Sequence, residues 1–140
     1  MGDSSHLSTF GYTIYIPGYQ DFIPGNQPDY THAALMHELT HVYQKQNWKY
    51  WPTKIVDFFL QIGMSTEKKY SFGTLTGKES FGDYRLEQQA SIIQAYYSGT
   101  RMYDHQQPVT DAEKTIIEKM LCGQGLLSKG VCDAAAQKKI

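Results

Sequence analysis

The sequence MHELTHVYQ, residues 36–44, contains the feature that most constrains this chain: two histidines four positions apart, with a glutamate directly after the first. On an α-helix, residues i and i+4 lie on one face, so His37 and His41 can present imidazole nitrogens to one metal ion. Glu38 is rotated by about 100° from His37 and flanks that position. There it can accept a proton from a water molecule that the ion activates. The pattern predicts a helix that carries part of a zinc (Zn²⁺) site.

Chance also produces this spacing, and the two histidines could be partly exposed helix residues beside a solvated glutamate. The flanking residues argue against chance. Residues 33–36 and Leu39 are small or apolar, which predicts that the helix is largely buried. Buried histidines without a metal ion would need other hydrogen-bond partners. We therefore favour the metal-binding interpretation.

A catalytic zinc site needs a third protein ligand and an open fourth position. The metzincin extension is missing, because Gln44 and Asn47 occupy the positions of its glycine and its histidine. A glutamate on a later helix is the other option, and Glu87 in YRLEQQA is the best candidate. Ala90, nearly one turn on, leaves room for the first helix to approach. Glu87 could also be a surface carboxylate, as most glutamates are, and would then bind no metal ion. The competing candidates lie in or near expected loops, where a ligand is held less firmly: Glu79, Asp83, Asp104 and His105.

The apolar periodicity predicts an α+β fold that is mostly helical with a short sheet. Local signals support several helix ends, namely Thr31 as an N-cap, Gly99 as a stop, and a capping box of Thr110 and Glu113. Helices are expected over residues 32–46, 55–62, 83–97 and 110–123, and from residue 132. A strand is expected over residues 12–16, a loop over 19–30, and a short strand or hairpin near 69–77.

Length and composition narrow the possible functions. The chain has 140 residues, which predicts a single domain over residues 1–140. Its net charge of -1 does not indicate the excess of positive charge that nucleic-acid binding needs. No apolar run is long enough to span a bilayer. The Ser-rich start lacks the order of a secretory signal, and we expect it to be a frayed tail or the trimmed end of a longer protein. Cys122 and Cys132 could form a disulfide or remain reduced, because pairing depends on an unknown compartment.

The order of the motifs between Tyr12 and Tyr97 carries further information. A β-branched strand is followed by the loop GYQDF, then by LMHELTHV, and later by YRLEQQA. This order resembles a small zincin-like metallopeptidase family of bacteria. Members of that family are often encoded with, or fused to, Rhs and type VI secretion spike proteins.

The resemblance implies a small zincin-like domain with a gluzincin-type site. His37, His41 and Glu87 would then be the metal ligands, and Glu38 the general base. It also implies a link to toxin delivery or to cell-envelope targets, with export through a type VI secretion system. Thermolysin-like enzymes carry an aspartate four residues after the ligand glutamate, whereas this chain has Ser91. Which groups orient the imidazoles is therefore left open.

The expected function is a zinc-dependent hydrolase that cleaves an amide bond in a peptide or in peptidoglycan. Glu38 would take a proton from the attacking water and deliver it to the leaving amine. The strand over residues 13–16 could border the cleft and pair with an extended substrate. Tyr84 or His105 could donate a hydrogen bond to the oxyanion.

Two alternatives from other classes also fit the sequence. One is a zinc-containing adaptor or cargo module of a secretion spike, without catalysis. The other is a structural zinc domain whose fourth position is closed by another side chain. The substrate, the compartment and the oligomeric state stay open at this point.

Overall fold

The computed structural model describes residues 8–10, 12–15, 29–47 and 63–139. Helices make up most of these residues, and the strands form two small antiparallel sheets. The predicted class, α+β and mostly helical with little sheet, is confirmed. In chain order the elements are β1 (Ser8–Phe10), β2 (Thr13–Tyr15), α1 (Asp29–Gln46), α3 (Thr66–Tyr70), the 3-10 turn η2 (Phe81–Asp83), α4 (Leu86–Ser98), β3 (Thr100–Arg101), β4 (Gln107–Pro108), α5 (Asp111–Gly123) and α6 (Lys129–Gln137).

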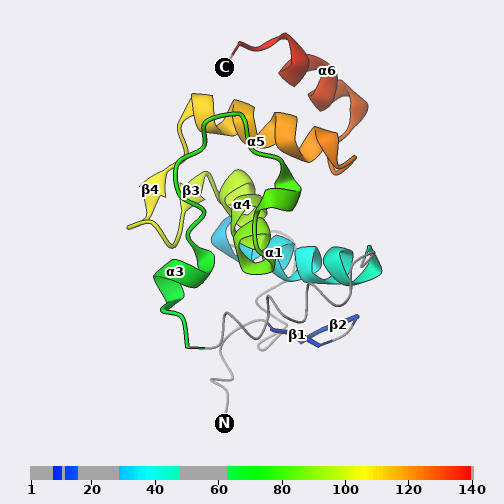
Figure 1. Cartoon of the computed structure of the whole chain (residues 1–140). Helices are drawn as coiled ribbons and strands as arrows, with labels where there is room; N and C mark the ends of the chain where they lie inside the picture. The colour runs from blue at the N-terminus through cyan, green and yellow to red at the C-terminus, as the bar shows by residue number, and fades with distance from the viewer. Residues whose placement is uncertain (1–7, 11, 16–28, 48–62, 140) are drawn as a thin grey trace.

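Helices α1 and α4 pack against each other and form the centre of the molecule. Figure 1 shows α6, α5, α4, α1 and the β1–β2 hairpin in succession from the C-terminal side of the molecule to the N-terminal side. Ala33 of α1 and Ala90 of α4 are 1% and 0% exposed. These small side chains allow the two helix backbones to come close. The packing therefore joins the two helices that carry the predicted metal ligands.

The hydrophobic core lies between α4, α5 and the irregular segment that joins α3 to α4. Met36 of α1 packs against its border. Helix α4 thus turns one face to the core, while Glu87 and Gln94, two turns apart, face His37 of α1. The buried residues of the core are Phe72, Leu75, Phe81, Ile92, Ile93, Ala95, Ile116, Ile117, Met120 and Leu121.

The end of α4 and the start of α5 lie where the sequence predicts them. Gly99 stops α4 with a φ of 72°, a left-handed conformation that glycine adopts without strain. At the start of α5, Oγ1 of Thr110 accepts from the backbone N–H of Glu113 at 3.2 Å. In return, Oε2 of Glu113 accepts from the backbone N–H of Thr110 at 2.9 Å. This is the predicted capping box.

Two helices begin earlier than predicted. Helix α1 begins at Asp29, so Thr31 lies inside the helix and is not its N-cap. Helix α6 begins at Lys129, because the side chain of Ser128 accepts from the backbone N–H of Val131 at 3.4 Å and caps the first turn. Serine and threonine occur both at helix ends and within helices, so residue type alone does not locate the boundary.

The prediction of a strand or hairpin near residues 69–77 is wrong. Residues 66–70 form helix α3, whose N-cap Ser65 accepts from the backbone N–H of Lys68 at 3.3 Å. The chain after α3 is irregular until η2, and α4 begins only at Leu86. A short run with an aromatic residue does not distinguish a strand from a single capped helical turn.

The expectation of a frayed N-terminal tail is wrong for residues 8–10. They form β1, which pairs with β2 and lies against α1. The predicted strand over residues 12–16 therefore becomes one half of a hairpin. The paired residues are Ser8 with Tyr15, Thr9 with Ile14, and Phe10 with Thr13.

The two cysteines, whose state the sequence left open, form a disulfide. Cys122 and Cys132 are joined with their Cα atoms 5.6 Å apart, which ties the end of α5 to α6. Two predictions, the helix over residues 55–62 and most of the loop over 19–30, lie outside the described residues. None of the helices in the described ranges is long and apolar enough to cross a membrane.

Candidate metal centre

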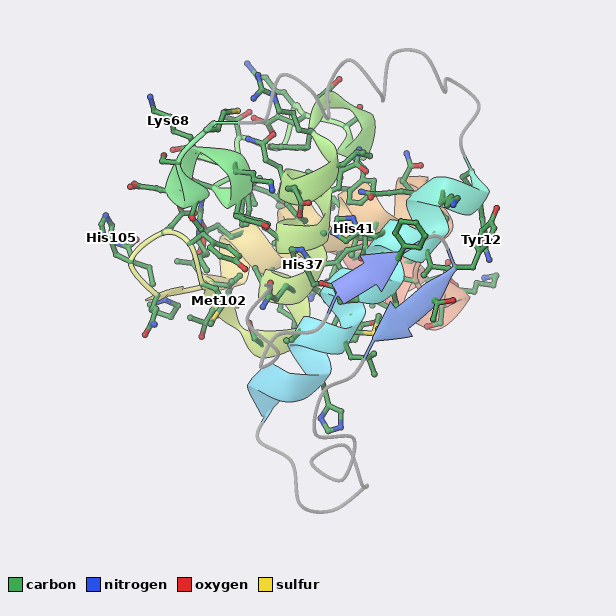
Figure 2. The ribbon with its side chains drawn as sticks, turned by 90° about the horizontal axis from the view of Figure 1, so that it is seen from below. Tyr12, His37, His41, Lys68, Met102 and His105 are labelled. Carbon is green, nitrogen blue, oxygen red and sulfur yellow. A yellow bond between two sulfur atoms is a disulfide. The ribbon has the colours of Figure 1, made fainter. Side chains whose placement is uncertain are left out.

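The two histidines of α1 converge on a single carboxylate of α4. Oε2 of Glu87 lies 3.3 Å from Nε2 of His37 and 3.2 Å from Nε2 of His41. His37 is buried, with 6% of its surface exposed, while His41 and Glu87 are partly buried. Figure 2 shows both histidines side by side where α1 meets α4. The structure thus brings together the three residues that the sequence analysis selected as ligands.

These separations are close to those between two ligands of one metal ion, and they also lie within the range of a hydrogen bond or an ion pair. A charge-assisted hydrogen bond between a nitrogen and a carboxylate oxygen is about 2.7–2.9 Å long. Two atoms that are each about 2.0–2.1 Å from a tetrahedral zinc ion lie roughly 3.3 Å apart. The observed distances of 3.2 and 3.3 Å are close to the second value. Imidazole nitrogen and carboxylate oxygen are also the donor atoms that zinc prefers.

Glu38 adds a second carboxylate to the centre. One potential ligand atom each from His37, Glu38 and His41 lies within 4.8 Å of the other two, so this group could hold a metal ion. Of the two carboxylates, that of Glu87 has the short contacts to both Nε2 atoms. Glu38 is thus a possible ligand within this group, whereas its place in the helix predicts a carboxylate that flanks the ion.

A strand that the sequence analysis missed contacts Glu38. The hydroxyl of Thr9 in β1 donates to Oε2 of Glu38 at 2.5 Å and lies 3.3 Å from its backbone oxygen. The side-chain contact to Glu38 thus comes from β1, while the predicted strand β2 pairs with β1 and also contacts α1. Thr9 was not selected from the sequence, because β1 lies in a segment that was expected to be a frayed tail.

Two glutamines contact the Nδ1 atoms of the imidazoles, the ring nitrogens that do not contact Glu87. Nδ1 of His37 lies 3.0 Å from Oε1 of Gln94, and Nδ1 of His41 lies 2.9 Å from Oε1 of Gln44. Ser91, four residues after Glu87, donates to the backbone oxygen of Glu87 at 2.9 Å. The spacing of Gln94, two helical turns after Glu87, is the sequence signal that could have identified it.

The charges at the centre reinforce one another. Burial alone would raise the pKa of Glu87, but hydrogen bonds and charge from His37 and His41 hold that pKa far below its usual range. Burial alone would lower the pKa of His41, but Glu87, with smaller contributions from Gln44 and Glu38, raises it above its usual value. In the protein without a metal ion, Glu87 is therefore ionised and attracts a positive charge to this position.

Two tyrosines beside the centre were not identified from the sequence. The ring of Tyr70 lies 5.8 Å from the ring of His37 and stacks on Tyr103 at 4.5 Å between centroids. Burial, and then the charge of Glu87, raise the pKa of Tyr70 to about 12, with Tyr103 and Glu38 adding to the effect. Burial, Glu87 and Glu38 raise the pKa of Tyr103 as well. Both hydroxyls keep their protons near neutral pH and can donate hydrogen bonds.

The structure places the two predicted oxyanion donors elsewhere. Tyr84 packs against the hydrophobic core, and its pKa is raised by burial and then by Glu79 and Asp83. His105 is exposed on the loop between β3 and β4, and Figure 2 shows it at the edge of the molecule, away from His37. Their selection rested on residue type alone, which does not show which side chains meet.

The competing third ligands are engaged in other contacts. Glu79 binds the backbone and hydroxyl of Thr76, and Asp83 accepts from the backbone N–H of Ser80 at 2.7 Å. Asp104 forms an ion pair with Arg101 at 2.6 Å. These contacts organise loops.

Comparison of the chain with protein families, with curated proteins and with solved structures finds no match.

Proposed function

We propose that this chain is a zinc-dependent hydrolase that cleaves an amide bond in a peptide or in peptidoglycan. The convergence of both Nε2 atoms on Oε2 of Glu87, at 3.3 and 3.2 Å, carries the proposal. Two imidazoles and one carboxylate are a common ligand set of catalytic zinc sites, which keep a fourth position open. His37, His41 and Glu87 would hold the ion, in agreement with the gluzincin-type resemblance.

Glu38 is the proposed general base. A bound zinc ion supplies a Lewis acid that polarises the scissile carbonyl and makes a water molecule easier to deprotonate. Glu38 takes the proton from that water and later transfers it to the leaving amine. The hydroxyl of Thr9 holds one oxygen of the carboxylate at 2.5 Å, which leaves the other oxygen for proton transfer. The bond from β1 thus orients the base.

Tyr70 is the proposed donor to the oxyanion, in place of the two residues selected from the sequence. Its ring lies 5.8 Å from that of His37, and stacking on Tyr103 restricts its orientation. A hydroxyl with a pKa of about 12 remains protonated at neutral pH. It can therefore donate to the negative oxygen that develops on the substrate.

The hairpin supports a substrate with an extended backbone. Within the described residues β1 pairs only with β2, and its second edge is the one that we propose for the substrate. An extended peptide could add to that edge through main-chain hydrogen bonds. Because Thr9 of β1 contacts Glu38, such a peptide would lie next to the general base. Proteins and the stem peptides of peptidoglycan both provide an extended chain with amide bonds.

A second candidate is a zinc-containing adaptor or cargo module of a type VI secretion spike. In such a module the hydrogen bond from Thr9 would satisfy one oxygen of a Glu38 carboxylate that has no catalytic role. Both candidates bind zinc, so metal content does not distinguish them. Cleavage does.

The test offers two substrates, an unrelated denatured protein and purified peptidoglycan. The purified 140-residue chain is assayed as prepared, after removal of metal with a chelator, and after zinc is restored. We expect cleavage of one of the two substrates, its loss with the chelator, and its recovery with zinc. Stoichiometric zinc without cleavage of either substrate would favour the adaptor, and an absence of zinc binding would contradict both candidates.

A further inference from the structure

Each imidazole of the metal centre makes a second contact on the side away from Glu87. Oε1 of Gln44 lies 2.9 Å from Nδ1 of His41, and Oε1 of Gln94 lies 3.0 Å from Nδ1 of His37. Both glutamines are 7% exposed. Water has little access to these amides, so their partners must come from the protein, and those partners decide the tautomer of each ring.

Backbone geometry sets the direction of the Gln44 amide. Its Nε2 donates to the backbone oxygen of Leu86 at 2.8 Å and to Oε1 of Gln89 at 2.9 Å. A backbone carbonyl can only accept a hydrogen bond, so the group that faces Leu86 must be the NH₂ group. The oxygen of Gln44 then faces His41, and Nδ1 of His41 must carry the proton. Nε2 of the neutral ring is left with its lone pair.

Gln89 extends this chain of amides to the backbone around η2. Its Nε2 donates to the backbone oxygens of Phe81, at 3.1 Å, and Tyr84, at 3.0 Å. Both donors are thereby used, and Oε1 is the atom left to accept from Gln44. Gln89 is 5% exposed. Three backbone carbonyls, including that of Leu86, thus determine the orientation of two side chains and one imidazole.

We propose that Gln44 and Gln94 are positioning residues of the metal centre, each holding one imidazole with Nδ1 protonated. Both Nε2 lone pairs are then available to the ion, and Gln89 holds Gln44 in place. The inference rests on the metal-binding part of the proposed function and does not require catalysis. Partners of this kind fix the orientation of ligand imidazoles. Neutral amides achieve this without adding a further negative charge to the site.

Zinc affinity tests the role of Gln94. Gln94→Leu removes the acceptor while nearly conserving volume, and we expect it to weaken zinc binding about 10- to 100-fold in competition with a chromophoric chelator. Gln94→Glu retains an acceptor at the same place, and we expect it to bind zinc at least as tightly as the wild type. Gln88→Leu is the matched control on the same helix, because Gln88 bonds to the backbones of Arg85 and Ser71. Its zinc affinity should equal that of the wild type.

Nitrogen-15 NMR of labelled histidine tests the tautomers directly. In the zinc-loaded wild type we expect a slowly exchanging Nδ1–H on both His37 and His41, and the shift of a metal-bound nitrogen at each Nε2. Gln89→Leu should speed the exchange of the Nδ1–H of His41 and leave that of His37 unchanged. A general loss of stability would affect both rings alike, so the selectivity identifies a positioning role.

The results separate failure of this inference from failure of the proposed function. If the wild type binds no zinc, the proposed metal site is wrong, and the positioning role of the glutamines fails with it. If it binds zinc but Gln94→Leu binds as tightly as Gln88→Leu, the inference alone is overturned. The same holds if Gln94→Glu is as weak as Gln94→Leu, or if the proton is found on Nε2.

Discussion

The hydroxyl of Thr9 donates to Oε2 of Glu38 at 2.5 Å, although 29 positions separate the two residues in the chain. The contact joins the β1–β2 hairpin to the face of α1 that carries the candidate metal site. It places a strand and a carboxylate at one site, and within the described residues this strand pairs only with β2. An extended substrate that joined this strand would lie beside that carboxylate.

Removal of this contact should slow catalysis without loss of metal. A hydrogen bond to a charged group contributes about 1.5–3 kcal/mol, which corresponds to roughly tenfold or more in rate if it orients the base. We therefore expect Thr9→Val to lower kcat by roughly tenfold and to keep its zinc. Thr13→Val, at an exposed position of β2, is the control. Equal kcat values for the two variants would exclude an orienting role for Thr9.

Tyr70 and Tyr84 provide a matched pair for the oxyanion donor. Tyr70→Phe removes a hydroxyl beside His37 and should reduce kcat by roughly 100-fold, the usual scale for one such donor. Tyr84→Phe alters a side chain that packs against the core and should leave kcat nearly unchanged. Steady-state kinetics of both zinc-loaded variants measures the difference. A larger loss in Tyr84→Phe would return the role to the residue selected from the sequence.

Glu87→Ala should weaken zinc binding more than any change to the glutamines. Loss of an outer partner costs about 10- to 100-fold in affinity, and loss of a direct ligand exceeds that range. Glu67→Ala, at an exposed site in the first turn of α3, controls for loss of charge. Calorimetric titration with zinc gives both affinities. If Glu87→Ala and Glu67→Ala bind zinc equally well, Glu87 is not a ligand.

The pH dependence of stability in the presence of a chelator follows from the pair of His41 and Glu87. The pKa of His41 is raised from 6.5, so its contribution is complete below that value and is lost as pH rises through the raised pKa. The pKa of Glu87 is lowered from 4.5, so its contribution is complete above that value and is lost as pH falls through the lowered pKa. The pair therefore stabilises the metal-free protein most between these two reference values.

Thermal unfolding of the wild type and of Glu87→Gln across pH measures this contribution. We expect the difference in Tm to be largest between the reference values of 4.5 and 6.5, and to shrink on either side. A difference in Tm that is independent of pH would show that the pair does not titrate as described.

Features that depend on local spacing were predictable from the sequence. His37 and His41 share a helix face because of their separation, and Glu87 was selected because it falls beside the buried face of a later helix. The capping box of Thr110 and Glu113 is likewise a local arrangement. Each of these needs only helical geometry or one turn of chain.

Features that depend on long-range packing were not predictable. Thr9 reaches Glu38 only because β1 pairs with β2 and the hairpin lies on α1. Tyr70 approaches His37 because residues 66–70 form a helix, where the sequence suggested a strand. Gln94 could have been found from its spacing to Glu87. The sequence of α4 alone, however, does not show which face of the helix meets α1.

Cleavage by Glu38→Gln tests the central claim most directly. Glutamine retains the size of the side chain and can accept the hydrogen bond from Thr9, but it cannot take a proton from water. We expect this variant to bind one zinc ion as the wild type does, and to lose hydrolysis of the denatured protein or peptidoglycan substrate that the wild type cleaves. Hydrolysis at the wild-type rate by zinc-loaded Glu38→Gln would contradict the assignment of Glu38 as the general base, and with it the proposed mechanism.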